Sequence, residues 1–140
     1  MGLTITATNA KYEFDIGYGG FFRLRKNIAL TLDQEFGELY GQLIYCHTPS
    51  QFEDNDRAIE LLINRKHLDE KYKDILDFLY MSDCEGQISY KTCKQIYDLI
   101  CHKNFDDKYF RYAAYAHNDY EEFKEFLKDC YSHHKNMKWY

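Results

Sequence analysis

The 140-residue sequence contains no valine, one proline (Pro49) and one tryptophan (Trp139). No apolar run approaches the roughly 18 residues that a membrane span requires, and no segment resembles a secretory signal. The five cysteines are odd in number and irregularly spaced, which argues against a disulfide framework. These absences favour a cytoplasmic protein with free thiols and no membrane contact.

The length predicts one domain, spanning residues 1–140. Hydrophobic residues make up 45 % of the chain, and 14 tyrosines and 10 phenylalanines stand in place of valine. We therefore expect a core of Tyr, Phe, Leu and Ile. Aromatic residues are enriched at interfaces, so this composition suits a binding protein; a coding bias toward tyrosine is the alternative.

The charge balance gives a net charge of -5, from 18 cationic and 23 acidic residues. A protein that binds duplex nucleic acid in general needs a basic surface, so direct duplex binding is not expected. The balance permits local binding of a small anion. It also permits an acidic protein that occupies the basic groove of another protein.

The hydrophobic pattern predicts an α+β fold, mostly α: a helical domain with a small N-terminal β-hairpin. Strands are expected over 3–8 and 11–16, joined at Asn9-Ala10. Pro49 is expected to end the second helix and to lie in an exposed loop over 47–55, and a further loop is expected over 81–88. Helices are expected over 21–32, 33–46, about 54–65, 69–79, 89–100, 105–116 and 118–130.

The segment Asp15–Lys26 holds the first candidate site. Glycines at 17, 19 and 20 follow an alternating strand and precede a helix that carries three cations in its first turns. Glycines permit a turn with positive φ, and a helix N-terminus attracts anions. The segment matches neither GxGxxG nor GxxxxGK[ST], so a plain strand-to-helix connection is the alternative. The expected ligand-binding residues are Tyr18, Gly19, Gly20, Arg23, Arg25 and Lys26.

Arg111 and Tyr115 form a second candidate site, since residues four apart share one helix face. An arginine beside a tyrosine can hold a phosphate and stack a base. The alternative is a helix on which Arg111 pairs with Asp107.

Catalytic and metal signatures are weak. The segment 82–89 resembles a calcium loop but has Met81 and Thr92 where carboxylates are needed, so a turn followed by a helix capped by Ser89 is the better interpretation. Cys84, Cys93 and Cys101 lack the spacing of zinc ligands. We therefore expect no metal, no cofactor and no enzymatic activity. The acids of the C-terminal helix form either a solvated face or a strip for a basic partner. Trp139 is expected either to dock on the body or to form a subunit contact.

Two motifs resemble small proteins of unassigned function that occur in bacteria and their phages. One is Met1-Gly2-Leu3-Thr4-Ile5-Thr6 followed by Gly17-Tyr18-Gly19-Gly20-Phe21, and the other is the segment 78–88 with its Ser-Asp-Cys-Glu-Gly core. The resemblance carries no activity over to any residue. It implies a phage protein with an anti-defence role in the host cytoplasm.

These observations lead to two expectations of function. The first is a non-catalytic sponge that sequesters a nucleotide-derived immune signal. Homo-oligomerisation would help to build a deep pocket for that signal at a subunit boundary. The second is an anti-CRISPR-like inhibitor that binds a host defence nuclease through acidic surfaces. The partner is thus either a nucleotide-type small molecule or a host defence protein.

Overall fold

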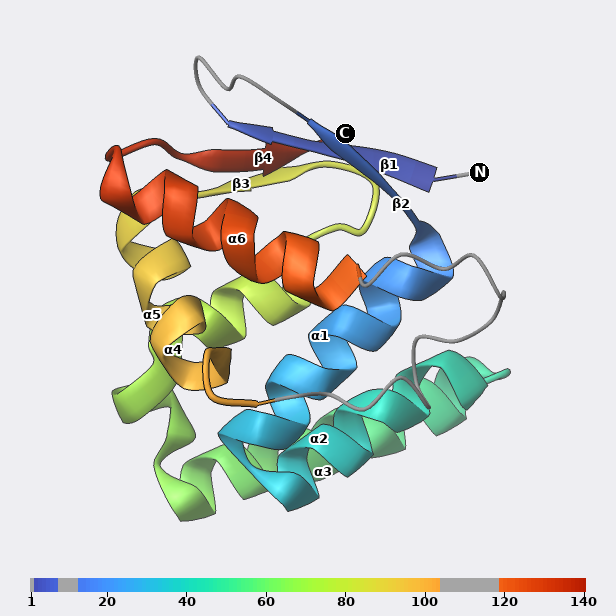
Figure 1. Cartoon of the computed structure of the whole chain (residues 1–140). Helices are drawn as coiled ribbons and strands as arrows, with labels where there is room; N and C mark the ends of the chain where they lie inside the picture. The colour runs from blue at the N-terminus through green and yellow to red at the C-terminus, as the bar shows by residue number, and fades with distance from the viewer. Residues whose placement is uncertain (1, 8–12, 104–118) are drawn as a thin grey trace.

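The computed structural model describes residues 2–7, 13–103 and 119–140, and confirms the α+β, mostly α class (Figure 1). The strands are β1 (Gly2–Ala7), β2 (Phe14–Gly17), β3 (Gly86–Ile88) and β4 (Met137–Trp139). The helices are α1 (Tyr18–Leu32), α2 (Gln34–Gly41), the short 3-10 helix η1 (Gln42–Tyr45), α3 (Pro49–Lys66), α4 (Leu68–Tyr80), α5 (Tyr90–Ile100) and α6 (Asp119–Ser132).

The four described strands form one antiparallel sheet in the order β2-β1-β4-β3, which lies across one end of the helices (Figure 1). The predicted N-terminal hairpin is confirmed, with Leu3 opposite Ile16. β3 and β4 were not expected, and β3 lies within the segment predicted as a loop. Trp139 of β4 pairs with Ile5 on one side and with Gly86 on the other. The C-terminal strand therefore joins the N-terminal hairpin to β3.

The glycine segment differs from its prediction. Gly17 has φ -67° and ψ 154° and is the N-cap of α1, while Gly19 and Gly20 already belong to the helix. No glycine in the described ranges has a positive φ. The strand therefore leads straight into α1, three residues earlier than expected, and the predicted turn is wrong because the glycines start the helix.

Two glycines set the packing of α2 against α1. A Cβ placed on Gly37 would lie 2.4 Å from the Cα of Leu30, and one on Gly41 would lie 2.6 Å from Cε of Lys26. Gly37 faces Leu30, whereas Gly41, which comes later in α2, faces Lys26, which comes earlier in α1. The two helices therefore run antiparallel. Both glycines therefore permit close packing of the two helices.

The expected loop over 47–55 is wrong, because α3 begins at Pro49. Thr48 is its N-cap: Thr48 Oγ1 accepts a hydrogen bond from the Gln51 backbone N–H, and the Gln51 side chain accepts one from Thr48 N. Proline suits the first position of a helix, where its missing N–H is not needed. The segment is nonetheless exposed, as predicted.

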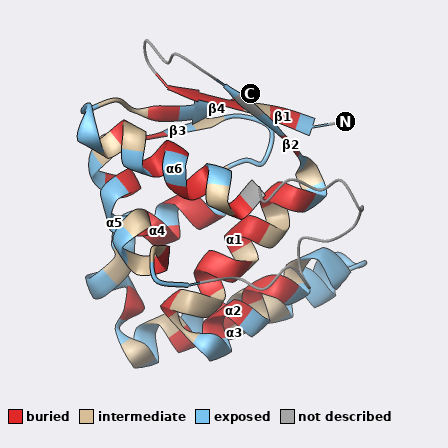
Figure 2. Ribbon diagram, in the orientation of Figure 1, coloured by how far each residue is buried: buried red, intermediate tan, exposed pale blue. Residues whose placement is uncertain are grey.

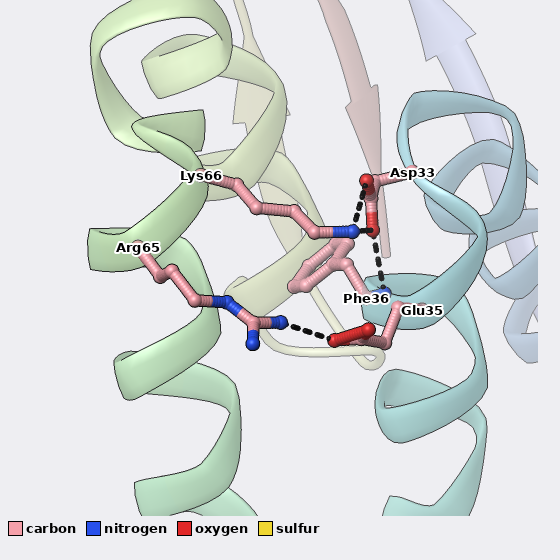
Figure 3. Close-up of polar contacts among 5 residues, drawn as sticks. All are labelled: Asp33, Glu35, Phe36, Arg65 and Lys66. Carbon is pink, nitrogen blue, oxygen red and sulfur yellow. Dashed lines mark hydrogen bonds and ion pairs between the residues drawn. The ribbon is translucent and has the colours of Figure 1, made fainter.

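The C-terminal end of α3 is held against the start of α2 (Figure 3). Lys66 Nζ lies 3.0 Å from Asp33 Oδ2, and Arg65 donates to Glu35 at 2.6 Å. Asp33 also accepts from Phe36 N and so caps α2. Burial opposes ionisation of Asp33, but these donors outweigh it and lower its pKa. Asp33 lies at the N-terminus of α2 and Lys66 at the C-terminus of α3, so each charge also interacts favourably with the dipole of its own helix.

The remaining helices match the hydrophobic pattern (Figure 2). Ser89 caps α5 as predicted. On the apolar face of α5, Tyr97 is half-buried. The other residues of the apolar faces of α5 and α6 are buried: Cys93, Ile96, Ile100, Phe123, Phe126, Leu127 and Cys130. A hydrogen bond with Cys130 and burial both raise the pKa of Cys93, which therefore behaves as a small hydrophobe. The helix expected over 105–116 lies outside the described residues, and so does Asn118, the expected start of the last helix.

Trp139 is docked on the body. It is 1 % exposed, its Nε1 donates to the Ser82 carbonyl at 3.0 Å, and its ring contacts Phe21 and Phe78. A Cβ on Gly86 would lie 2.1 Å from its ring. The tryptophan thus joins the sheet to α1 and α4.

Candidate functional site

A pocket of about 490 Å³ lies between α1 and the segment formed by α2 and η1. It is lined by Tyr18, Gly19, Phe22, Arg23, Lys26, Asn27, Gly41, Ile44, Tyr45 and Asp83. The residues of α1 recur at intervals of three or four, so they form one face of the helix over its first three turns. We call this space the α1 pocket.

One end of the α1 pocket lies at the N-terminus of α1. Gly17 offers no side-chain cap, and the first turn of α1 holds no acid, whereas α2, α3 and α5 each have a side-chain cap. A Cβ on Gly19 would lie 3.6 Å from Nη1 of Arg23, so the guanidinium lies over the first turn. A cation and the positive end of the helix dipole therefore act together at this end.

Aromatic rings form the walls of the α1 pocket. Phe22 is stacked on Tyr40, with ring centroids 5.9 Å apart and planes 8° from parallel. Across the pocket, Tyr45 is 62 % exposed and Ile44 is 53 % exposed. A flat apolar group can thus pack against Phe22 and be covered by Tyr45.

The other end of the α1 pocket is polar. Asn27 is only 3 % exposed, and its Nδ2 has no hydrogen-bond partner among the described residues. Leaving a buried amide N–H without a hydrogen-bond acceptor costs free energy. A ligand that accepted this hydrogen bond would recover that free energy. Lys26 lies against Gly41. Asp83, an exposed residue, also lines the pocket.

Arg25 lies apart from the α1 pocket. Its guanidinium donates to the carbonyl oxygens of Met81 at 2.8 Å and Ser82 at 3.3 Å, and stands 4.4 Å above the Phe21 ring. It is 4 % exposed, and burial lowers its pKa. These contacts occupy Arg25 in holding the 81–82 segment against α1, so the structure does not bring it to the pocket.

The other predicted site residues have mixed outcomes. Tyr18, Gly19, Arg23 and Lys26 do line the α1 pocket, whereas Gly20 is buried on another side of α1. Arg111 and Tyr115 lie outside the described residues.

Sequence reasoning missed the pocket residues Phe22, Asn27, Tyr45 and Asp83. The four-residue spacing of Gly19, Arg23 and Asn27, and of Tyr18, Phe22 and Lys26, would have indicated the α1 face. Nothing local in the sequence indicates that Tyr45 and Asp83 approach it.

Within 2–7, 13–103 and 119–140, no group of three His, Cys, Asp or Glu side chains is arranged to hold a metal ion. The described helices include none that is both long and apolar enough to cross a membrane. Comparisons with protein-family models, with curated proteins and with solved structures find no match.

Proposed function

We propose that the protein captures a nucleotide-derived small molecule in the α1 pocket and does not transform it. The observation that carries the proposal is a combination of features in one pocket. Arg23 lies over the start of α1, Lys26 stands further along the same helix face, Phe22 and Tyr45 supply aromatic rings, and the buried amide of Asn27 has no partner among the described residues. Cations and backbone N–H groups suit phosphates, aromatic rings suit bases, and an amide suits a base edge. As a phage anti-defence protein, it would act by lowering the free concentration of an immune signal.

The test is depletion followed by release. The purified protein is incubated with a cyclic dinucleotide and with ADP-ribose, removed by filtration, and then denatured by heat. Recovery of the same molecule from the denatured protein supports capture. A chemically altered product would indicate an enzyme, and the absence of any depletion would contradict the proposal.

Variants connect capture to the pocket. Arg23→Ala and Lys26→Ala should each weaken binding about ten- to hundredfold, since a charge-assisted hydrogen bond contributes roughly 1.5–3 kcal/mol. Arg57→Ala, on an exposed position of α3 that does not line the pocket, is the matched control. Unchanged binding in both pocket variants, with parent-like melting curves, would contradict the assignment of the site.

A second candidate function is inhibition of a defence nuclease through an acidic surface. The observation that favours it is the first half of α3, where Glu53 and Asp54 are exposed beside Phe52, which is itself 49 % exposed. Burial raises the pKa of Tyr80, and the nearby carboxylates of Asp56 and Glu60 raise it further. An aromatic residue among acids suits a basic partner. Retention of inhibition by Arg23→Ala together with its loss in Phe52→Ala would favour this function.

A further inference from the structure

A groove runs along the junction of α3 with α2 and η1, where α3 lies beside α2 (Figure 1). The half beside η1 has a volume of about 420 Å³, the half beside α2 has a volume of about 310 Å³, and the small residue Ala58 lines both halves. The lining residues of α3 recur every three or four positions and so form one face of the helix. We call this space the α3 groove. Its residues on α3 are Gln51, Asp54, Asn55, Ala58, Leu61, Leu62 and Arg65.

Two exposed apolar side chains lie along the α3 groove. Leu61 is 64 % exposed and Tyr45 is 62 % exposed, and these are the two most exposed large apolar side chains among the described residues. Leu61 lines the half beside α2, and Tyr45 lines the half beside η1. Apolar side chains that are exposed singly are ordinary on a protein surface, whereas several along one groove indicate an interaction site.

The charged side chains of α3 lie at opposite ends of the α3 groove. Asp54 lines only the half beside η1, and Arg65 lines only the half beside α2. Asp54 is exposed, and no ion pair within 2–7, 13–103 and 119–140 includes it. Arg65 donates to Glu35 through Nη2, and a guanidinium has further N–H donors. The groove therefore offers an acid at one end and a cation at the other.

The order of these residues along α3 is self-complementary. The midpoint between Asp54 and Arg65 falls halfway between positions 59 and 60, and the midpoint between Ala58 and Leu61 falls at the same point. A two-fold axis there lays α3 of a second copy antiparallel on α3 of the first. Asp54 of each copy then lies opposite Arg65 of the other, and Leu61 of each copy lies opposite the small Ala58 of the other. A two-fold interface requires such reciprocal pairs, whereas an unrelated partner requires no symmetry in the groove.

We infer that the α3 groove is the interface of a symmetric dimer, in which the α3 helices of two copies pack antiparallel. The opposite charges determine the direction of the pairing, and burial of Leu61 stabilises it. Tyr45 lines both the α3 groove and the α1 pocket, so the second copy also covers one wall of that pocket. The dimer does not depend on a bound nucleotide and is therefore tested on the protein alone.

The experiment is sedimentation velocity of the full chain over a series of concentrations. Asp54→Lys and Arg65→Glu each place like charges opposite one another at both ends of the interface. Each variant alone should therefore dimerise about tenfold or more weakly than the parent. An equimolar mixture of the two variants should recover parent-like dimers, because the mixed dimer restores opposite charges at both ends. Glu60→Lys is the matched control for Asp54→Lys, because it changes the same charge at an exposed position of α3 outside the groove, and it should dimerise like the parent.

A third variant tests the apolar part of the interface. Leu61→Asp should also weaken dimerisation about tenfold or more, with a melting curve close to that of the parent because Leu61 is exposed. A parent that remains monomeric at about 100 μM would overturn the inference and would leave nucleotide capture, which is measured separately, unaffected. Parent-like dimers in all three groove variants would overturn the assignment to α3. A mixture that stays monomeric, although both charge variants are folded, would overturn the antiparallel pairing.

Discussion

Arg23 and Arg25 are two positions apart in α1, yet they lie in opposite surroundings. Arg23 lines the α1 pocket, whereas Arg25 is buried under Trp139 and Phe78 and donates to two carbonyl oxygens. The sequence predicted three cations near the start of α1, but not which of them faces inward. That choice depends on the 81–83 segment, which is distant in sequence, so no local pattern distinguishes the two arginines.

We expect Arg25→Ala to destabilise the protein by about 3 kcal/mol or more. The substitution removes charge-assisted hydrogen bonds to the 81–82 carbonyls and leaves a cavity beside three aromatic rings. Urea denaturation measures the loss, and the exposed Arg57→Ala is the control, expected within about 0.5 kcal/mol of the parent. If the variant kept the stability of the parent but captured the nucleotide more weakly, Arg25 would be a ligand-binding residue and its structural role would be contradicted.

Tyr40 makes the folding stability of the protein depend on pH in the alkaline range. Its hydroxyl donates to the Leu79 carbonyl at 2.8 Å, and burial raises its pKa from 10.0 to about 12 although Arg25 opposes the shift. The folded state therefore holds the phenol proton more tightly than the unfolded state. This contribution is complete below pH 10 and is lost as the pH rises through about 12.

We expect the stability difference between the parent and Tyr40→Phe to shrink by about 2–3 kcal/mol between pH 9 and pH 12, as two pKa units require. Chemical denaturation at a series of pH values measures this difference. Burial also raises the pKa of Tyr120, so the parent should lose further stability over the same range. A difference between the two proteins that stays constant with pH would contradict the assignment to Tyr40.

At the scale of elements, the sequence predicted helices best where the signals were local. Ser89 before α5 and the apolar spacing of α6 were interpreted correctly. The start of α3 was missed because Pro49 was interpreted as a stop, although Thr48 and Gln51 form a capping box that the sequence itself contains. β3 and β4 have three residues each, too few for a periodic pattern, and they exist because they pair with distant strands.

The packing of α1 against α2 supports a matched pair of substitutions. Gly37→Ala places a methyl group 2.4 Å from backbone atoms of Leu30, which cannot move aside, so we expect a loss of about 3 kcal/mol. Gly41→Ala meets only the flexible end of Lys26, and alanine favours a helix by about 1 kcal/mol over glycine. Its stability should therefore remain close to that of the parent.

Gly41→Ala should instead weaken nucleotide capture, because it displaces Lys26 within the α1 pocket. Thermal melting and ligand titration on the same samples separate the two effects. Equal losses of stability in both variants, or parent-like capture by Gly41→Ala, would contradict this account of the interface.

At the scale of the whole molecule, the C-terminal strand determines how the parts hold together. β4 lies between β1 and β3, Thr4 and Tyr140 exchange two backbone hydrogen bonds, and Trp139 reaches the core formed with α1 and α4. β4 therefore connects the N-terminal hairpin, β3 and the helices to one another. The sequence offered docking of Trp139 as one of two alternatives, but its position in the middle of the sheet follows only from pairing with strands far away in the chain.

This arrangement predicts cooperative unfolding. Trp139 is the single tryptophan and contacts both the sheet and the helices, so its fluorescence should report the same transition as the far-ultraviolet circular dichroism of the helices. Removal of residues 136–140 should abolish the folded state, since it opens the sheet and empties the site of a fully buried ring. Tyr140→Ala, which keeps the backbone pairing with Thr4 and alters a side chain that is 60 % exposed, is the control and should unfold like the parent. Separate transitions for fluorescence and dichroism, or a folded truncated chain, would show that the helices hold together without the sheet and would contradict the prediction of one domain.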